Sequence, residues 1–134
     1  MNDFPLKIVT PDGVQFDGNA QELIVRTTCG DLGILAGHIN CVAPLGMGEA
    51  MVVVEGKKRY GACIGGMVSV VNGAVTLVPT TFEWSDSIDA QRADRSQKKA
   101  ETILADKASS DTDIRLAQAR LKRALIRKSV AERK

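Results

Sequence analysis

The chain has 134 residues, of which 25% are charged and 44% are hydrophobic, and its formal net charge at pH 7 is +2. This length suits one domain, or a small domain with an appendage. No apolar run approaches the roughly 20 residues that span a bilayer, and the first residues lack the basic-then-apolar layout of a secretory signal, so we expect neither a membrane-spanning helix nor a signal peptide.

Residues 1–84 have the pattern of an all-β domain. Short alternating segments are separated by turn signals at intervals of roughly 8 to 12 residues, which is typical of a sandwich or a barrel. The segments expected as strands are residues 6–10, 14–16, 22–28, 47–55, 59–64, 67–71 and 74–78. Asn72-Gly73, between two apolar alternations, is the strongest hairpin signal, because tight hairpin turns need residues that adopt positive φ.

Within this region, residues 29–38 are rich in glycine and are expected to form a loop. The end of the region marks a domain boundary, and Pro79 is expected to end the strand series there. The β-branched alternation stops at residues 80–86. Trp84, the only tryptophan, lies on this boundary and is expected to pack at the end of the sandwich or against the segment that follows.

Residues 85–134 have the pattern of two helices joined by a polar turn at residues 107–113. Neither Pro nor Gly interrupts this region, so nothing prevents two long helices from forming. The candidate N-terminal caps are Ser87 or Asp86 for the first helix, and Ser109, Ser110 or Asp111 for the second.

The apolar stripe along this helical hairpin is narrow. The residues expected to face the partner helix are Ala93, Ala100, Ile103 and Leu104 in the first helix, and Ile114, Ala117, Leu121, Ala124 and Leu125 in the second. Alanines allow close approach but bury little area, and burial is worth roughly 25 cal/mol per Å². We therefore expect a metastable hairpin that folds back on another surface or opens to hold a partner.

The net charge is distributed unevenly. Residues 1–84 carry five Lys or Arg against eight Asp or Glu, residues 85–109 carry five of each, and residues 110–134 carry eight against three, which is +5. A basic tail on a weakly acidic body suits nucleic acid, an acidic membrane surface or an acidic protein groove. Nucleic acid is disfavoured because no aromatic residue follows Trp84. An ordinary solvated helix face remains an alternative.

The sequence lacks the groups of a recognisable enzyme site. It has one histidine, no paired carboxylates in an acid–base context, no metal-ligand cluster, and no Lys-Ser/Thr after its glycine-rich segment. Cys29, Cys41 and Cys63 are far apart and are expected as small core residues in a reducing compartment. Two other interpretations stay open, a basic-tailed binding or scaffold module and a stand-alone nucleotide-binding enzyme.

Three segments together carry a resemblance to a known family. They are Gly-Asp-Leu-Gly-Ile-Leu-Ala-Gly-His at residues 30–38 with Ala-Pro-Leu at 43–45, Val-Thr-Pro-Asp-Gly at residues 9–13, and the basic stretch at residues 121–132. They resemble the signature loop, the first strand and turn, and the last helix of the ε subunit of bacterial F-type ATP synthases. The resemblance runs nearly end to end. It implies a ten-stranded β-sandwich followed by an antiparallel α-helical hairpin.

Membership of this family implies a non-catalytic subunit of the rotor's central stalk. The sandwich, residues 1–84, would dock on the γ subunit and on the polar loops of the membrane c-ring, with Asp31 and His38 as contact residues. The hairpin, residues 85–134, would lie folded or would extend into the α/β catalytic head, where it restrains ATP hydrolysis. The implied location is peripheral, at the cytoplasmic face of the bacterial plasma membrane.

One motif of the hairpin resembles the ATP-binding element of some bacterial ε subunits. Residues 88–93, Ile-Asp-Ala-Gln-Arg-Ala, fit its Ile/Leu-Asp-x-x-Arg-Ala pattern. The ATP-binding residues that the resemblance implies are Glu83, Ile88, Asp89, Arg92, Ala93, Arg123 and Arg127. ATP would be a regulatory ligand that is not turned over, and no metal site is expected. Three converging guanidinium groups would repel one another unless an anion such as a triphosphate lay among them.

The residues alone leave a second arrangement open. Helical spacing places Arg120, Arg123 and Arg127 on a ridge away from the apolar stripe of their helix, so the ridge faces water or a partner if that stripe faces the first helix squarely. Asp89 and Arg92 would then form an ordinary surface ion pair. Lys99 stands where the nucleotide-binding subgroup tends to have arginine.

Overall fold

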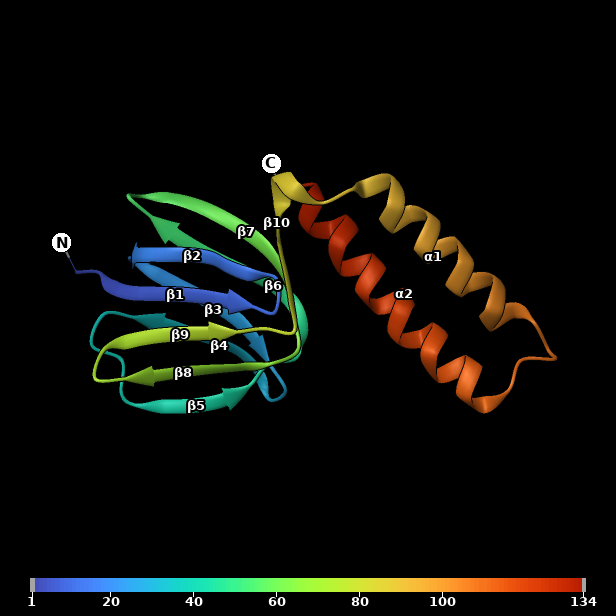
Figure 1. Cartoon of the computed structure of the whole chain (residues 1–134), viewed down its shortest axis with the longest axis horizontal. Coiled ribbons are helices and arrows are strands. Elements are labelled where there is room, and N and C mark those ends of the chain that lie inside the picture. Colours follow the sequence, from blue (N-terminus) through green and yellow to red (C-terminus); the bar gives the residue numbers. More distant parts are fainter. Residues whose placement is uncertain (1, 134) are drawn as a thin grey trace. The chain divides into compact units, whose positions relative to one another are not determined.

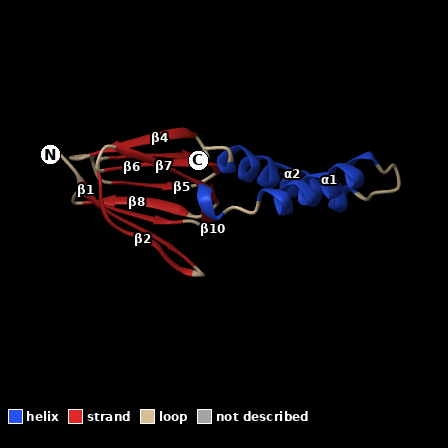
Figure 2. Ribbon diagram, turned by 90° about the horizontal axis from the view of Figure 1, so that it is seen from above, coloured by secondary structure: helices blue, strands red, loops and turns tan. Residues whose placement is uncertain are grey.

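The chain divides into two compact units, residues 1–84 and residues 85–134. The structure, a computed structural model, describes residues 2–133. The strands lie in the first unit and the helices in the second (Figure 2). The predicted fold class, a ten-stranded β-sandwich followed by an α-helical hairpin, is confirmed.

The first unit is a sandwich of two five-stranded sheets (Figure 1). One sheet has the strand order β2-β1-β9-β8-β5 and the other has the order β10-β7-β6-β3-β4. Paired strands are antiparallel, except that β1 and β9 run parallel. The strands are β1 (Phe4–Thr10), β2 (Gly13–Ala20), β3 (Glu22–Thr27), β4 (Gly30–Leu35), β5 (Cys41–Pro44), β6 (Met47–Val54), β7 (Lys57–Ile64), β8 (Met67–Val71), β9 (Ala74–Val78) and β10 (Thr81–Trp84).

The core lies between the two sheets and follows the two-residue alternation of the strands. In β1, Phe4, Leu6 and Ile8 are at most 2% exposed, while the residues between them face outward. The other fully buried large side chains of the strands are Leu23, Val25, Ile34, Val52, Val68, Val70 and Leu77. The apolar residues at alternate positions therefore form one continuous core.

The Asn72-Gly73 turn is confirmed. Asn72 and Gly73 have φ angles of 50° and 83°, and they join β8 to β9. Glu55 and Gly56 join β6 to β7 in the same way, with φ angles of 51° and 77°. Positive φ at both central residues matches the twist of the flanking strands, which explains why glycine stands second in each turn.

Two strand predictions are wrong. Residues 29–38 are not a continuous loop, because β4 occupies Gly30–Leu35 and pairs with β3 along its whole length. Its glycines hid this strand, since glycine lowers strand propensity. Pro79 does not end the series either, because β10 follows it and pairs with the buried end of β7 at the sheet edge.

The cysteines divide by exposure. Cys63 is buried, and burial raises the pKa of its thiol to about 12. Cys41 is half-buried and packs against the core, whereas Cys29 is exposed in the turn before β4. The prediction of small core residues is therefore right for Cys63 and Cys41 and wrong for Cys29.

Trp84 ends the sandwich as part of an aromatic cluster. Its ring makes edge contacts with Phe82 and Phe16, at centroid distances of 4.8 and 6.3 Å. Its Nε1–H donates a hydrogen bond to the Gln15 carbonyl at 3.1 Å, and the Arg59 guanidinium lies 3.9 Å from its ring centroid. Only 9% of Trp84 is exposed. The indole therefore joins β10 to β2 and β7.

The second unit is a pair of antiparallel helices, α1 (Ala90–Ala105) and α2 (Asp111–Ala131), preceded by the 3₁₀ turn η1 (Ser85–Ser87). The predicted cap of α1 is wrong. Asp89, not Ser87 or Asp86, caps α1, because its carboxylate accepts the Arg92 backbone N–H. Ser110, one of the candidates, caps α2 in a reciprocal capping box with Asp113.

Replacing Trp84 should destabilise the sandwich more than any exposed apolar substitution. We expect Trp84→Ala to lower the free energy of unfolding by about 3–5 kcal/mol, because it leaves a cavity among Phe16, Phe82 and Arg59. Trp84→Phe should cost less, since it mainly removes the bond to Gln15. Denaturant unfolding followed by far-ultraviolet circular dichroism measures both, with Val14→Ala at a 57% exposed position as the control. Equal stabilities for Trp84→Ala and Val14→Ala would refute this role.

Candidate functional site

The two helices meet along a seam of alanines. Ala93 and Ala100 in α1, and Ala117 and Ala124 in α2, are at most 4% exposed. Each pair is seven residues apart, so its members lie on one face of their helix. Leu125, which was predicted to face α1, is 46% exposed instead. The close approach of the alanines turns the contact face of α2 away from this leucine.

This change in the contact face determines where the arginines of α2 lie. Arg120 and Arg127 follow Ala117 and Ala124 by three residues, so they flank the seam, and Arg123 lies further round the same side. All three arginines are half-buried. They therefore do not form a ridge remote from α1, as the predicted leucine stripe would have required.

Two cations of α1 lie at the same edge of the hairpin. Arg92 and Lys99 each precede a seam alanine by one residue, which turns them about 100° from the seam. Arg120 and Arg127 follow seam alanines by three residues, which turns them about 60° from the seam in the same rotational sense as Arg92 and Lys99. Because the helices are antiparallel, equal rotations bring side chains to the same edge. We call Arg92, Lys99, Arg120, Arg123 and Arg127 the cationic edge.

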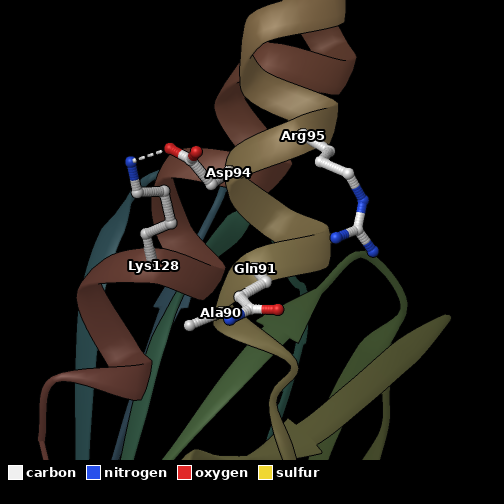
Figure 3. Close-up of a pocket in the computed structure, with 5 residues that line it drawn as sticks. All are labelled: Ala90, Gln91, Asp94, Arg95 and Lys128. Atoms are coloured by element: carbon white, nitrogen blue, oxygen red, sulfur yellow. Dashed lines mark hydrogen bonds and ion pairs between the residues drawn. The ribbon is translucent and has the colours of Figure 1, made fainter.

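The opposite edge holds a polar link between the helices. The Lys128 ammonium donates to Asp94 Oδ1 at 2.9 Å (Figure 3). It also donates to Gln97 Oε1 at 2.7 Å. Lys98, on the same helix as Asp94, pairs with its other oxygen, Oδ2, at 3.0 Å. Hydrogen bonds from Lys128, and then from Lys98, hold the pKa of the Asp94 carboxyl below its ordinary value of 3.8. Asp94 therefore stays ionised at neutral pH.

A shallow pocket of about 430 Å³ adjoins this link. It is lined by Ala90, Gln91, Asp94, Arg95 and Lys128. Figure 3 shows Gln91 and Arg95 on one side of α1, and Asp94 and Lys128 on the other. The residues predicted to bind nucleotide do not line this pocket.

The predicted nucleotide residues occupy varied environments. Asp89 is exposed and its carboxylate accepts the Arg92 backbone N–H at 3.0 Å, so this contact is a helix cap and not an ion pair with the guanidinium. Arg92 is exposed, whereas Ile88 and Ala93 are buried. Glu83 lies in β10 of the sandwich and is half-buried. Helical spacing puts Arg92 on the same edge of the hairpin as Arg123 and Arg127.

The predicted partner-contact residues lie on the sandwich. Asp31 is on β4, directly opposite Arg26 on β3, and the two form an exposed ion pair at 3.2 Å. His38 follows β4 and is half-buried, and its Nδ1 donates to the Ile39 carbonyl at 2.8 Å. Ile39 itself is 77% exposed. The ion pair therefore lies beside the turn between β3 and β4, whereas His38 and Ile39 follow the opposite end of β4.

The outer face of one sheet is apolar. Val42, Met67, Val71 and Val78 are 43–64% exposed and lie on the neighbouring strands β5, β8 and β9. Pro44 is opposite Met67, which is opposite Val78, so the patch is continuous across three strands. We call Val42, Pro44, Met67, Val71 and Val78 the apolar sheet face. Large apolar groups gathered on one exposed face are typical of a docking surface.

Sequence reasoning missed the link between Lys128 and Asp94. The only sequence signal near it was the four-residue spacing of Asp94 and Lys98, which predicts a pair within α1. Nothing in the sequence gives the alignment of one helix against the other. Among residues 2–133, no group of three or more His, Cys, Asp or Glu is placed to hold a metal ion, and no helix is long and apolar enough to cross a membrane.

Two family descriptions match consecutive parts of the chain. Residues 3–85 match "ATP synthase, Delta/Epsilon chain, beta-sandwich domain", and residues 86–132 match "ATP synthase, Delta/Epsilon chain, long alpha-helix domain". The chain is 42% identical over 131 residues to the ATP synthase epsilon chain of Bacillus velezensis, covering 98% of both. It is 41% identical over 132 residues to that of Ruminococcus albus, again covering 98% of both.

Solved structures share the fold. A chain in the structure of the Euglena gracilis mitochondrial ATP synthase OSCP/F1/c-ring assembly matches with a TM-score of 0.83 at 21% identity, covering 95% of this chain and 80% of that one. A chain in the central stalk and c-ring structure of the Tetrahymena thermophila mitochondrial enzyme matches with a TM-score of 0.60 at 13% identity, covering 95% of both. At these identities the likeness concerns the fold alone.

The contribution of Asp94 to the hairpin should depend on pH only under acidic conditions. Because folding lowers the pKa of Asp94, the contribution of Asp94 to hairpin stability is complete above the ordinary pKa of 3.8. It is lost as the pH falls through the lower pKa of the folded state. Carboxyl-carbon NMR of Asp94 should therefore give a midpoint below 3.8. Lys128→Gln removes the hydrogen bond that lowers the Asp94 pKa most, so the titration midpoint should rise in this variant. A wild-type midpoint at or above the ordinary value would contradict the observed contacts.

Proposed function

The chain belongs to the delta/epsilon family of ATP synthase subunits, and we propose that, as the epsilon subunit of a central stalk, it docks through its sandwich and regulates ATP hydrolysis through its hairpin. The γ subunit and the polar loops of the c-ring are the proposed docking partners. ATP is the proposed ligand of the closed hairpin. It binds there without being turned over and acts on the catalytic head only through the state of the hairpin.

The cationic edge is the observation that carries the ATP proposal. Arg120 and Arg123 are three residues apart and Arg123 and Arg127 are four apart, so these like charges destabilise α2 by about 0.2–0.5 kcal/mol for each pair. Closing the hairpin adds Arg92 and Lys99 to the same edge. A polyanion bound along this edge would relieve the repulsion in the closed state, and guanidinium groups are suited to phosphate.

This arrangement couples ATP to the state of the hairpin. Arg92 lies on α1 and the other arginines on α2, so a ligand that holds both sets favours the closed form. A ligand that binds the closed form better than the open form shifts the equilibrium towards the closed form. Its difference in affinity for the two forms limits the size of this shift. When ATP is scarce, the hairpin opens and frees residues 110–134, whose charge is +5. The proposed target of that basic segment is the α/β catalytic head, where it restrains hydrolysis.

The apolar sheet face supports the docking proposal. Its five residues form an exposed apolar surface that a soluble chain rarely leaves uncovered. We assign this face to the γ subunit, since central-stalk docking needs a stable, largely apolar interface. Asp31, with His38, is assigned to the polar c-ring loops, because an exposed ion pair retains its hydration and suits a polar surface.

Isothermal titration calorimetry of the full chain with ATP tests the ligand. We expect saturable binding of ATP that is tighter than the binding of ADP, because ADP presents one charged phosphate group fewer to the arginines. Arg92→Gln and Arg123→Gln should each weaken ATP binding about tenfold, the value of one charge-assisted hydrogen bond. Arg115→Gln is the matched control, since Arg115 is an exposed arginine of α2 outside the cationic edge.

Absence of ATP binding by the wild-type chain would remove the nucleotide proposal. Equal weakening by Arg115→Gln and Arg123→Gln would show that only the overall charge matters, and it would favour a basic-tailed binding module instead.

Rebinding to an ATP synthase stripped of its own epsilon subunit tests the docking face. We expect Met67→Glu and Val78→Glu to weaken rebinding at least about tenfold, because each buries an unpaired charge in the interface. Leu116→Glu is the control, since Leu116 is 64% exposed on α2 and lies outside the sandwich. Unchanged rebinding by both patch variants would place the interface elsewhere.

A further inference from the structure

We propose that Asp94, Gln97 and Lys128 form a latch that closes the hairpin without nucleotide and thereby positions the arginines of α2 beside Arg92. The positioning role rests on the proposed ATP site, whereas the latch itself does not require any ligand. These three residues lie outside the set that the ATP motif implies.

The contacts of Lys128 identify the latch. Its ammonium group reaches from α2 to two acceptors on α1, Asp94 Oδ1 at 2.9 Å and Gln97 Oε1 at 2.7 Å. The two acceptors are three residues apart, so they stand on adjacent turns of one helix face and hold the ammonium between them. Asp94 and Lys128 have side-chain exposures of 39% and 34%, so the pair is partly shielded from water.

A single link of this kind matters because the seam is weak. Each of the four seam alanines buries only one methyl group, so the four together contribute little hydrophobic stabilisation. Helices in proteins owe most of their stability to the packing of an apolar face, and the packed face is narrow here. A pair of charge-assisted hydrogen bonds is therefore a substantial share of what holds the closed state together.

The latch lies at the edge opposite the cationic edge. Lys128 is adjacent to Arg127 in sequence, and the step of about 100° between them places the two side chains on different sides of the seam. A nucleotide on the cationic edge would leave Lys128 untouched. Lys128 thus acts as a positioning residue, and it influences ATP only through the fraction of hairpins that are closed.

Two readouts separate this role from direct contact. Closure without ligand is measured by hydrogen exchange and mass spectrometry of the full chain, and ATP affinity by calorimetry. In Lys128→Gln we expect the amides of α1 and α2 to exchange about two- to fivefold faster, the value of a partly exposed ion pair, with the sandwich unchanged. The apparent ATP affinity should fall by the factor by which the closed fraction falls. That factor, multiplied by the rise in exchange rate, should equal the change in the closing equilibrium.

The chain supplies closely matched controls. Lys98→Gln removes a lysine that pairs with the same carboxylate from within α1, so it should leave exchange in α2 nearly unchanged. Lys122→Gln removes an exposed lysine from the outer side of α2. The double variant Asp94→Lys, Lys128→Asp swaps the two charges and restores a cross-helix ion pair, so it should recover slow hydrogen exchange. A general loss of folding would not be rescued in this way.

Each outcome decides one of the two proposals. Faster exchange in Lys128→Gln alone, with rescue by the charge exchange, establishes the latch. Equal behaviour of Lys128→Gln, Lys98→Gln and Lys122→Gln overturns it. A wild-type chain that does not bind ATP overturns the ATP site and with it the positioning role, and the exchange measurements then decide the latch by themselves.

Discussion

The alanine seam between α1 and α2 is the constraint on which the behaviour of the hairpin depends. Ala93, Ala100, Ala117 and Ala124 let the helices approach closely, and the buried area they provide is small. Because this area is small, polar interactions at the two edges of the hairpin make up a large share of what holds the helices together.

Those edges carry opposite kinds of interaction. On one edge, Lys128 is satisfied by Asp94 and Gln97, which favours closure at all times. On the other edge, helical spacing gathers five cationic side chains, which is the arrangement that the proposed polyanionic ligand would stabilise. The sandwich contributes differently, since its large core and the Trp84 cluster give a rigid platform with an apolar outer face. A unit with a large core and a unit with a narrow seam thus share one short chain.

Much of the fold could be predicted from the sequence, because local signals specify it. The Asn72-Gly73 turn, the alternating strands and the uninterrupted helical segments each reflect a conformation that the residues themselves prefer. β4 was missed because its pairing with β3 outweighs the low strand propensity of Gly30 and Gly33. The candidate site was less predictable. The arginines could be named by resemblance, but their position relative to α1, like the Lys128 link, depends on the alignment of two helices.

Native-state hydrogen exchange of the wild-type chain without nucleotide, followed residue by residue at rising denaturant, tests the central claim that the hairpin is a marginal unit beside a stable sandwich. The account predicts that amides of α1 and α2 exchange through an opening of much lower free energy than the core amides of β1 and β6, with no shared transition. A single unfolding free energy common to the helices and the core strands would contradict it, because the hairpin would then have no separate equilibrium for a ligand or a latch to shift.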